Sequence, residues 1–114
     1  LVVQGQVHGG IVQGLGQALM ERTVYDETGQ LLTGSFMDYT VPRADTISDI
    51  DFTHMGVKSL NNEMGIKGCG EAGTVGACAA VMNAIQRALD PLDVGFVDMP
   101  ATPDRLWRQI RAAS

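Results

Sequence analysis

The sequence is poor in aromatic residues, in basic clusters and in long apolar runs. Aromatic side chains make up 5% of its 114 residues, and 13 acidic against 8 basic side chains give a formal net charge of −5. Binding to nucleic-acid phosphates needs clustered Lys and Arg, so this balance argues against a general nucleic-acid-binding protein. No apolar stretch approaches the roughly 20 residues that a transmembrane helix needs. We therefore expect neither a nucleic-acid partner nor a transmembrane segment.

Cysteine is scarce as well, with Cys69 and Cys78 alone. Two cysteines are too few for a disulfide scaffold, and neither has His or Cys at the spacing of a zinc site. We expect reduced thiols, no metal ion held by protein ligands and a cytoplasmic location. No basic segment followed by an apolar run opens the chain, which predicts no signal peptide. The length suits a single domain over residues 1–114, and the opening Leu1-Val2-Val3 is typical of the interior of a longer polypeptide.

Apolar periodicity predicts three helices. The first begins at Ile11 and ends at Glu21-Arg22, after a glycine-rich loop over 4–10. The second covers 72–89 and ends at Asp90-Pro91, because proline cannot continue a helix. Thr102-Pro103-Asp104 favours the start of a third, with Thr102 as N-cap. The expected apolar faces are Ile11, Leu15, Ala18 and Leu19; Val75, Cys78, Ala79, Met82, Ile85 and Leu89; and Leu106, Trp107 and Ile110.

Alternating and turn-forming residues predict strands between these helices. Residues 23–27 and 30–38 are typical of a β-hairpin, with Gly29 supplying the positive φ of its turn. Residues 49–54 alternate like a half-buried strand, and 94–97 could form a short last one. The predicted fold class is therefore α+β, with helices packed on a small mixed or antiparallel sheet that includes a β-hairpin.

The densest feature is the glycine-rich stretch 65–76. Gly68, Gly70 and Gly73 match G-x-G-x-x-G, a pattern typical of dinucleotide-binding turns. We give this interpretation little weight because no buried strand precedes the stretch and Glu71 would bring negative charge into a phosphate cradle. Too little chain also follows to complete a β-α-β unit.

Glu71 allows two interpretations. A solvated glutamate in the first turn of a helix interacts favourably with the helix dipole, typically by about 0.3–1 kcal/mol. Burial among the small neighbours Gly70, Ala72 and Gly73 would instead remove water from the carboxylate, which suits a general base. The same small neighbours would leave room for a ligand.

The stretch Gly65–Gly73 resembles an active-site segment of the molybdenum hydroxylase large subunit, the family of xanthine dehydrogenases, aldehyde oxidoreductases and aerobic carbon monoxide dehydrogenases. Gly5–Gly16 resembles a second segment of that subunit. The pattern Glu21, Tyr25-Asp26, Gly29, Asp38-Tyr39, Pro42 and the tail Asp98–Pro103 with Trp107 follow it as well. The resemblance covers nearly the whole chain in order, and it implies the C-terminal part of a molybdopterin-binding domain.

The resemblance also implies roles for individual residues. Glu71 matches the glutamate that accepts a proton beside the molybdenum, and is the expected catalytic residue. Gln6 matches the glutamine that hydrogen-bonds the pterin, and an amide offers both a donor and an acceptor. Gly9, Gly10 and Gly70 are expected to let the backbone approach the cofactor. Lys67 matches a lysine that supports the site, while His8 and Cys69 are expected to make ordinary polar or pocket contacts.

The implied cofactor is the molybdenum-pterin cofactor, as molybdopterin or its cytosine dinucleotide. Iron–sulfur clusters and FAD would lie on partner domains or subunits, and the upstream part of the same large subunit would complete the site. The implied reaction is hydroxylation of a carbon centre in an aldehyde, an N-heterocycle or carbon monoxide, with oxygen derived from water. A different class also fits the sequence, a small stand-alone binding or interaction domain that keeps the fold without catalysis.

Overall fold

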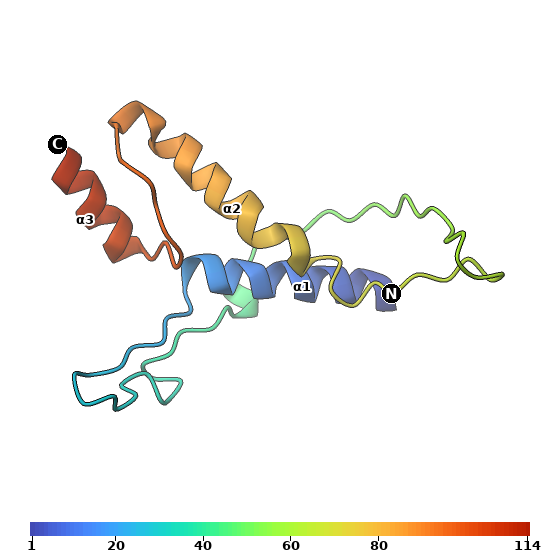
Figure 1. Ribbon diagram of the computed structural model, residues 1–114, viewed down its shortest axis with the longest axis horizontal. Helices are drawn as coiled ribbons and strands as arrows, with labels where there is room; N and C mark the ends of the chain where they lie inside the picture. Colours follow the sequence, from blue (N-terminus) through green and yellow to red (C-terminus); the bar gives the residue numbers. More distant parts are fainter.

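The computed structural model describes residues 1–114 as three helices joined by long irregular segments (Figure 1). The helices are α1 (Val2–Leu19), α2 (Thr74–Leu89) and α3 (Pro103–Ala113), with short 3₁₀ turns η1 (Ala44–Thr46) and η2 (Asp90–Leu92). The only β-type pairing is an isolated bridge between Tyr25 and Leu31. The predicted α+β class with a small sheet is therefore wrong, and the chain is all-helical. None of its helices combines the length and apolarity needed to cross a bilayer.

Helix α1 begins nine residues before the predicted start, and the glycine-rich segment 4–10 lies inside it. Glycine disfavours a helix interior by about 1 kcal/mol, which is why this segment was predicted as a loop. Packing against α2 outweighs that cost, because the buried Gly10 and Gly14 lie in the contact between the two helices. The small and apolar residues at 3, 7, 10, 14 and 18 recur every three to four positions, so the helical stripe extends back through the glycines.

Helices α2 and α3 lie close to where the sequence places them. The prediction of 72–89 is confirmed within two residues, and α3 begins at Pro103 with Thr102 as its N-cap residue. Three of the predicted contact residues are wrong, since Val75 is 86% exposed, Trp107 is 63% exposed and Ala79 is exposed as well. The contact face of α2 is rotated toward Ala77, the one buried residue in its N-terminal half.

The predicted hairpin reduces to its turn. Gly29 has φ of 84°, its amide donates to the Asp26 carbonyl, and the Asp26 carboxylate accepts from the amides of Thr28 and Gln30. Beyond this turn, the predicted strands 23–27 and 30–38 form only the isolated bridge between Tyr25 and Leu31. An isolated two-stranded ribbon is marginally stable in water, and this one extends away from the helices without a third strand (Figure 1).

The other two predicted strands are also irregular. Residues 49–54 alternate in polarity but form neither a strand nor a bridge with any other segment of this chain. Residues 94–97 are not a strand either. Val94 and Val97 are nevertheless buried, and with Leu89 and Ala101 they form a four-residue core against which Leu106 and Ile110 of α3 pack.

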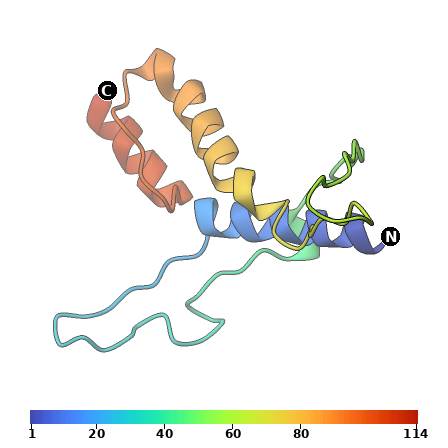
Figure 2. The same ribbon diagram turned by 45° about the vertical axis from the view of Figure 1, so that its right-hand side comes forward.

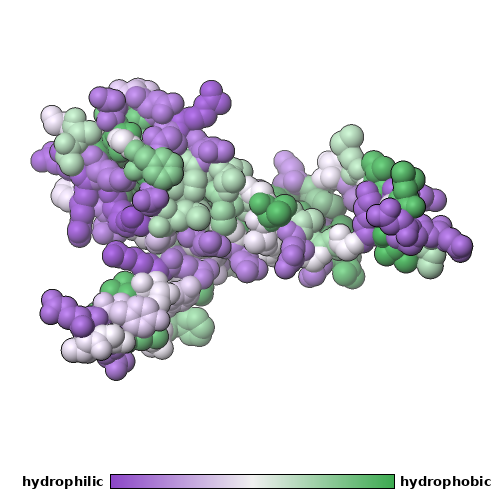
Figure 3. Space-filling model, viewed as in Figure 1, coloured by the Kyte–Doolittle hydropathy of each residue, from purple (hydrophilic) through white to green (hydrophobic).

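The chain buries little of itself. Only 10 of 114 residues are buried, and the radius of gyration is 17.9 Å. A compact chain of this length would have about 13 Å. Two long arms leave the helices in different directions (Figure 2), and exposed apolar side chains gather on both arms and over the helices (Figure 3). Apolar surface exposed to this extent is typical of an interaction surface.

The base of the first arm is closed by a hydrogen bond from the Tyr39 hydroxyl to the carboxylate of Glu21, which lies just past the end of α1. This bond raises the pKa of Tyr39 above its ordinary value of 10.0, since the carboxylate stabilises the protonated phenol and its charge repels the phenolate.

A pH-dependent stability follows from this bond. A raised folded-state pKa gives stabilisation that is complete below about pH 10 and is lost as the pH rises through the folded-state value. We expect Tyr39→Phe to lower the melting temperature of the complete protein below pH 10. Above that pH the difference from the native protein should shrink; a difference that grows with pH would contradict this contact.

Candidate cofactor-binding site

The glycine-rich loop reaches α2 through two local turns. In the first, Asn62 holds Ile66, because its side-chain oxygen accepts from the Ile66 amide at 2.8 Å and its amide nitrogen donates to the Ile66 carbonyl at 3.0 Å. Gly65 closes this turn with φ of 68°, a conformation that favours glycine. In the second, the Ala72 amide donates to the Cys69 carbonyl. The loop is thus held by its own hydrogen bonds before α2 begins.

Glu71 lies in the turn that leads into α2, three residues before the helix begins at Thr74. Its backbone carbonyl accepts hydrogen bonds from the amides of Thr74 and Val75, both at 3.1 Å. The Glu71 carbonyl therefore takes part in the first hydrogen-bonded turn of α2. Its side chain is exposed. The expectation of a dry recess is therefore not met by residues 1–114 alone, although the expected position at a helix start is confirmed.

Gln6 lies beside this loop, 64 residues away in sequence from Gly70. A Cβ atom placed on Gly70 would be 3.7 Å from the Gln6 side-chain nitrogen. Gln6 is on the exposed side of the N-terminal half of α1, and the loop passes over that half of the helix (Figure 1). The structure thus brings the Gln6 side chain next to Gly70, the residue that precedes Glu71 in the loop.

The two helices meet through glycine where the loop enters α2. A Cβ atom on Gly73 would lie 2.8 Å from the Ile11 amide nitrogen and would collide with the Val7 carbonyl. One on Gly10 would lie 2.9 Å from the Thr74 nitrogen. Only hydrogen fits at both positions, so these glycines set how closely α2 approaches α1.

Gly9 and Gly10 do not lie in a loop before the first helix, as predicted. Both lie well inside α1, where amides are occupied by helical hydrogen bonds and are not free to bind a phosphate. The two differ in surroundings, since Gly10 is buried against α2 while nothing in the chain lies within 4 Å of a Cβ on Gly9. Gly9 therefore presents an open helix surface, and Gly10 serves helix packing.

A cleft of about 530 Å³ lies on one side of the loop. Lys67 and the half-buried free thiol of Cys69 line it from the loop, and Val3 and Val7 line it from α1. Its far wall is the irregular segment that carries Phe52 and His54. The cleft shows that the loop does not collapse on α1, which leaves space next to the predicted site.

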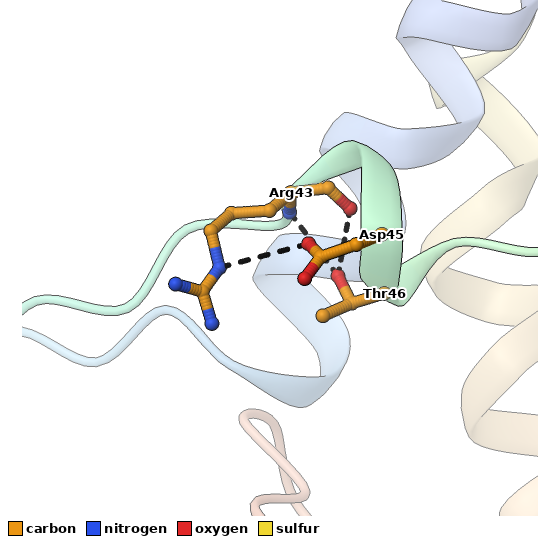
Figure 4. Close-up of polar contacts among 3 residues, drawn as sticks. All are labelled: Arg43, Asp45 and Thr46. Atoms are coloured by element: carbon orange, nitrogen blue, oxygen red, sulfur yellow. Dashed lines mark hydrogen bonds and ion pairs between the residues drawn. The ribbon is translucent and has the colours of Figure 1, made fainter.

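A second cleft, of about 550 Å³, lies on the other side of α1 between His8 and the segment 42–51. His8 packs edge-on against Phe52 with ring centroids 6.4 Å apart, and its Nε2 atom is buried without a hydrogen-bond partner. The η1 turn in the wall of this cleft is closed by hydrogen bonds between Arg43 and Thr46 and by an exposed ion pair, 3.9 Å long, from Arg43 to Asp45 (Figure 4). Such an exposed pair contributes little stability.

The structure contradicts the dinucleotide-binding interpretation of the glycine-rich stretch. Its fingerprint needs a strand before the first glycine and a β-α-β unit around it, and the chain contains no strand. Thr74, in contrast, is a contact residue that the sequence does not single out, and Gly73 stands out there only as part of the glycine-rich pattern. The available signal was spacing, because Gly10 and Gly14 on one helix match Thr74 and Cys78 on the other, each pair four residues apart.

Comparison with known proteins agrees with this geometry. Residues 1–48 match the family described as a molybdopterin cofactor-binding domain. The chain is 41% identical over 107 residues to the nicotine 6-hydroxylase large subunit of Paenarthrobacter nicotinovorans, covering 94% of this chain and 13% of that protein.

Two crystal structures contain the same arrangement of helices and arms. Quinoline 2-oxidoreductase from Pseudomonas putida 86 superposes with a TM-score of 0.90 at 42% identity, over 96% of this chain and 14% of that one. The Cu,Mo-containing CO dehydrogenase superposes with a TM-score of 0.92 at 32% identity, over 98% and 14%.

These matches define the class as the molybdopterin-binding large subunits of molybdenum hydroxylases. This chain belongs to that family and corresponds to its C-terminal segment. It spans about one seventh of the length of the relatives it matches.

Proposed function

We propose that this chain forms one wall of the active site in a molybdenum-cofactor oxidoreductase that hydroxylates a carbon centre with water-derived oxygen. The observation that carries the proposal is the approach of the Gln6 side chain to Gly70, the neighbour of Glu71, across 64 residues of sequence. Residues 1–114 would be one part of a larger molybdopterin-binding domain.

The residues at this place suit a pterin cofactor. Gln6 offers an exposed amide that can both donate and accept. Gly9 and Gly70 present backbone without side chains, so a flat polar group can approach closely. Gly10 would contribute indirectly. Its lack of a side chain would let α2 pack closely on α1, which brings Gly70 near Gln6. When bound, the molybdenum cofactor supplies the oxidising centre and the route by which electrons leave.

Glu71 is the proposed base, and its carboxylate would accept a proton during the reaction. Its present exposure gives it access to a ligand but does not exclude water. Upstream parts of the large subunit and the cofactor itself would cover it, since the chain leaves this face open. Lys67 would line the same site from the loop, on the side of the 530 Å³ cleft.

The partners follow from the same proposal. The remaining large subunit would cover the exposed apolar side chains, and iron–sulfur and flavin subunits or domains would carry the electrons onward. The enzyme would work in the cytoplasm. Identity of 41–42% to enzymes named for nicotine and quinoline, against 32–33% for carbon monoxide dehydrogenases, favours an N-heterocycle over carbon monoxide as substrate. Assays of the complete enzyme with quinoline, an aromatic aldehyde and carbon monoxide separate these classes.

The alternative is a small interaction domain without catalysis. Such a domain must bury a sufficient core by itself, and small domains do this with difficulty even when they are compact. With 10 buried residues and none of its large side chains fully buried, this chain does not have such a core. The burial thus favours the active-site segment.

An experiment on the isolated chain distinguishes the two. We expect the purified 114-residue polypeptide to contain no bound molybdenum or pterin, to show no turnover and to self-associate, because the rest of the site and the cover of its apolar surface are missing. Elemental analysis, pterin fluorescence and light scattering measure these properties. A strictly monomeric chain that is stably folded would support the interaction domain, and a catalytically active one would overturn the view that this is one wall of the site.

A further inference from the structure

One side-chain hydrogen bond joins the start of α2 to the middle of α1. The Thr74 hydroxyl donates to the Gly10 carbonyl at 2.9 Å, across 64 residues of sequence. A helix carbonyl has a second lone pair beyond the one used by the helix, so it can accept this extra bond. The bond lies in the glycine contact, where Gly73 and Gly10 bring the two backbones together.

The same residue is bonded directly to Glu71 through the backbone. The Thr74 amide donates to the Glu71 carbonyl at 3.1 Å. Thr74 is therefore hydrogen-bonded to α1 through its side chain and to Glu71 through its main chain. Any sliding of α2 along α1 at this point would carry Glu71 and Gly70 away from Gln6.

We propose that Thr74 is a positioning residue that fixes Glu71 relative to Gln6. This inference rests on the proposed function, because it assigns Thr74 its role through the base. A positioning error of about 1 Å can lower a rate by about 10²-fold, so one hydrogen bond at this place can have a large kinetic effect. Thr74 itself is not proposed to touch substrate or cofactor.

The chain offers a matched control one helical turn further along the same contact. The Cys78 thiol lies 3.5 Å from the Gly14 carbonyl, again 64 residues apart. Thiols are weak donors, and Cys78 has no bond to the loop that carries Glu71. Removing this contact perturbs the same pair of helices without releasing Glu71.

The test uses the complete, cofactor-loaded enzyme with Thr74→Val, Thr74→Ser, Cys78→Ala and Glu71→Gln. Valine keeps the shape of threonine and removes the hydroxyl, while serine keeps the hydroxyl. We expect Thr74→Val to lower kcat per bound molybdenum roughly 10- to 100-fold, with a smaller change in KM and a displaced acid limb of the pH–rate profile. Thr74→Ser should restore both, and Cys78→Ala should leave both unchanged.

The possible results separate this inference from the proposed function. If Glu71→Gln loses turnover but Thr74→Val keeps the native kcat and pH profile, the positioning role is overturned and the base remains. If Glu71→Gln keeps full turnover, both fail. If Thr74→Val does not accumulate, Thr74→Ala is measured instead, and failure of both variants to fold contradicts a local positioning role.

Discussion

Replacing Glu71 with glutamine is expected to lower kcat of the complete enzyme by about 10²–10⁴-fold, the usual loss when an acid–base group is removed. The substitution keeps the size and shape of the side chain and removes its ability to accept the proton. Backbone contacts of Glu71 with Thr74 and Val75 are unaffected by it, so the loop should keep its position. Molybdenum and pterin content should therefore match the native enzyme, and steady-state kinetics per bound molybdenum give the measurement.

Glu63→Gln is the matched control for this substitution. Glu63 is an exposed glutamate eight residues before Glu71, ahead of the glycine-rich loop, so the same charge is removed without touching the proposed site. Turnover of this variant should stay within about twofold of the native enzyme, because exposed surface substitutions have small effects. A Glu71→Gln enzyme that is equally active, or one that has lost its molybdenum, would remove Glu71 from the role of base.

Replacing Gly73 with alanine is expected to destabilise the complete subunit by at least about 1–3 kcal/mol, the cost typical of overpacking. The new methyl group would meet the Val7 carbonyl and the Ile11 amide, which are backbone atoms of α1. A flexible side chain could move aside, but here the whole helix has to shift. The displaced α2 would carry Glu71 with it, so both the melting temperature and the molybdenum content should fall.

Gly76→Ala, three residues further along α2, is the control. Nothing lies within 4 Å of a Cβ at this position, and it is exposed. Alanine favours a helix over glycine by up to about 1 kcal/mol, so this variant should melt at the same temperature or slightly higher. Equal melting temperatures for the two alanine variants would show that the contact between α1 and α2 is looser than the structure has it.

The helices that the sequence predicted well are those with clear end signals. Thr102-Pro103 begins α3 and Asp90-Pro91 ends α2, and proline has the same backbone consequences in any tertiary context. The start of α1 was missed because its glycines are weak helix formers. These glycines are helical because they pack against α2, which lies 64 residues away in sequence. Local helix propensity does not take such a distant contact into account.

The strands failed for a related reason. An alternating pattern such as 49–54 indicates which faces are apolar, but a strand also needs a partner with free backbone groups. The chain offers none there, and apolar side chains such as Phe36 and Met37 remain 85% and 93% exposed on the first arm. Without a partner strand, these arms stay irregular.

The sequence predicts the members of the candidate site but not the contacts around them. Glu71 and Gln6 follow from the resemblance, and the structure places Gln6 next to Gly70. Thr74 was missed because a threonine in the first turn of a helix is ordinary, and only its contact with Gly10 distinguishes it. The expected burial of Glu71 is not found in this chain, where its side chain is exposed.

A structure of the complete large subunit with its bound cofactor tests the central claim most directly. We expect the Gln6 amide to contact the pterin, and the Glu71 carboxylate to face the molybdenum in a space closed to bulk water by upstream residues. A cofactor bound away from Gln6, or a Glu71 side chain still directed into solvent in that complete assembly, would contradict the account.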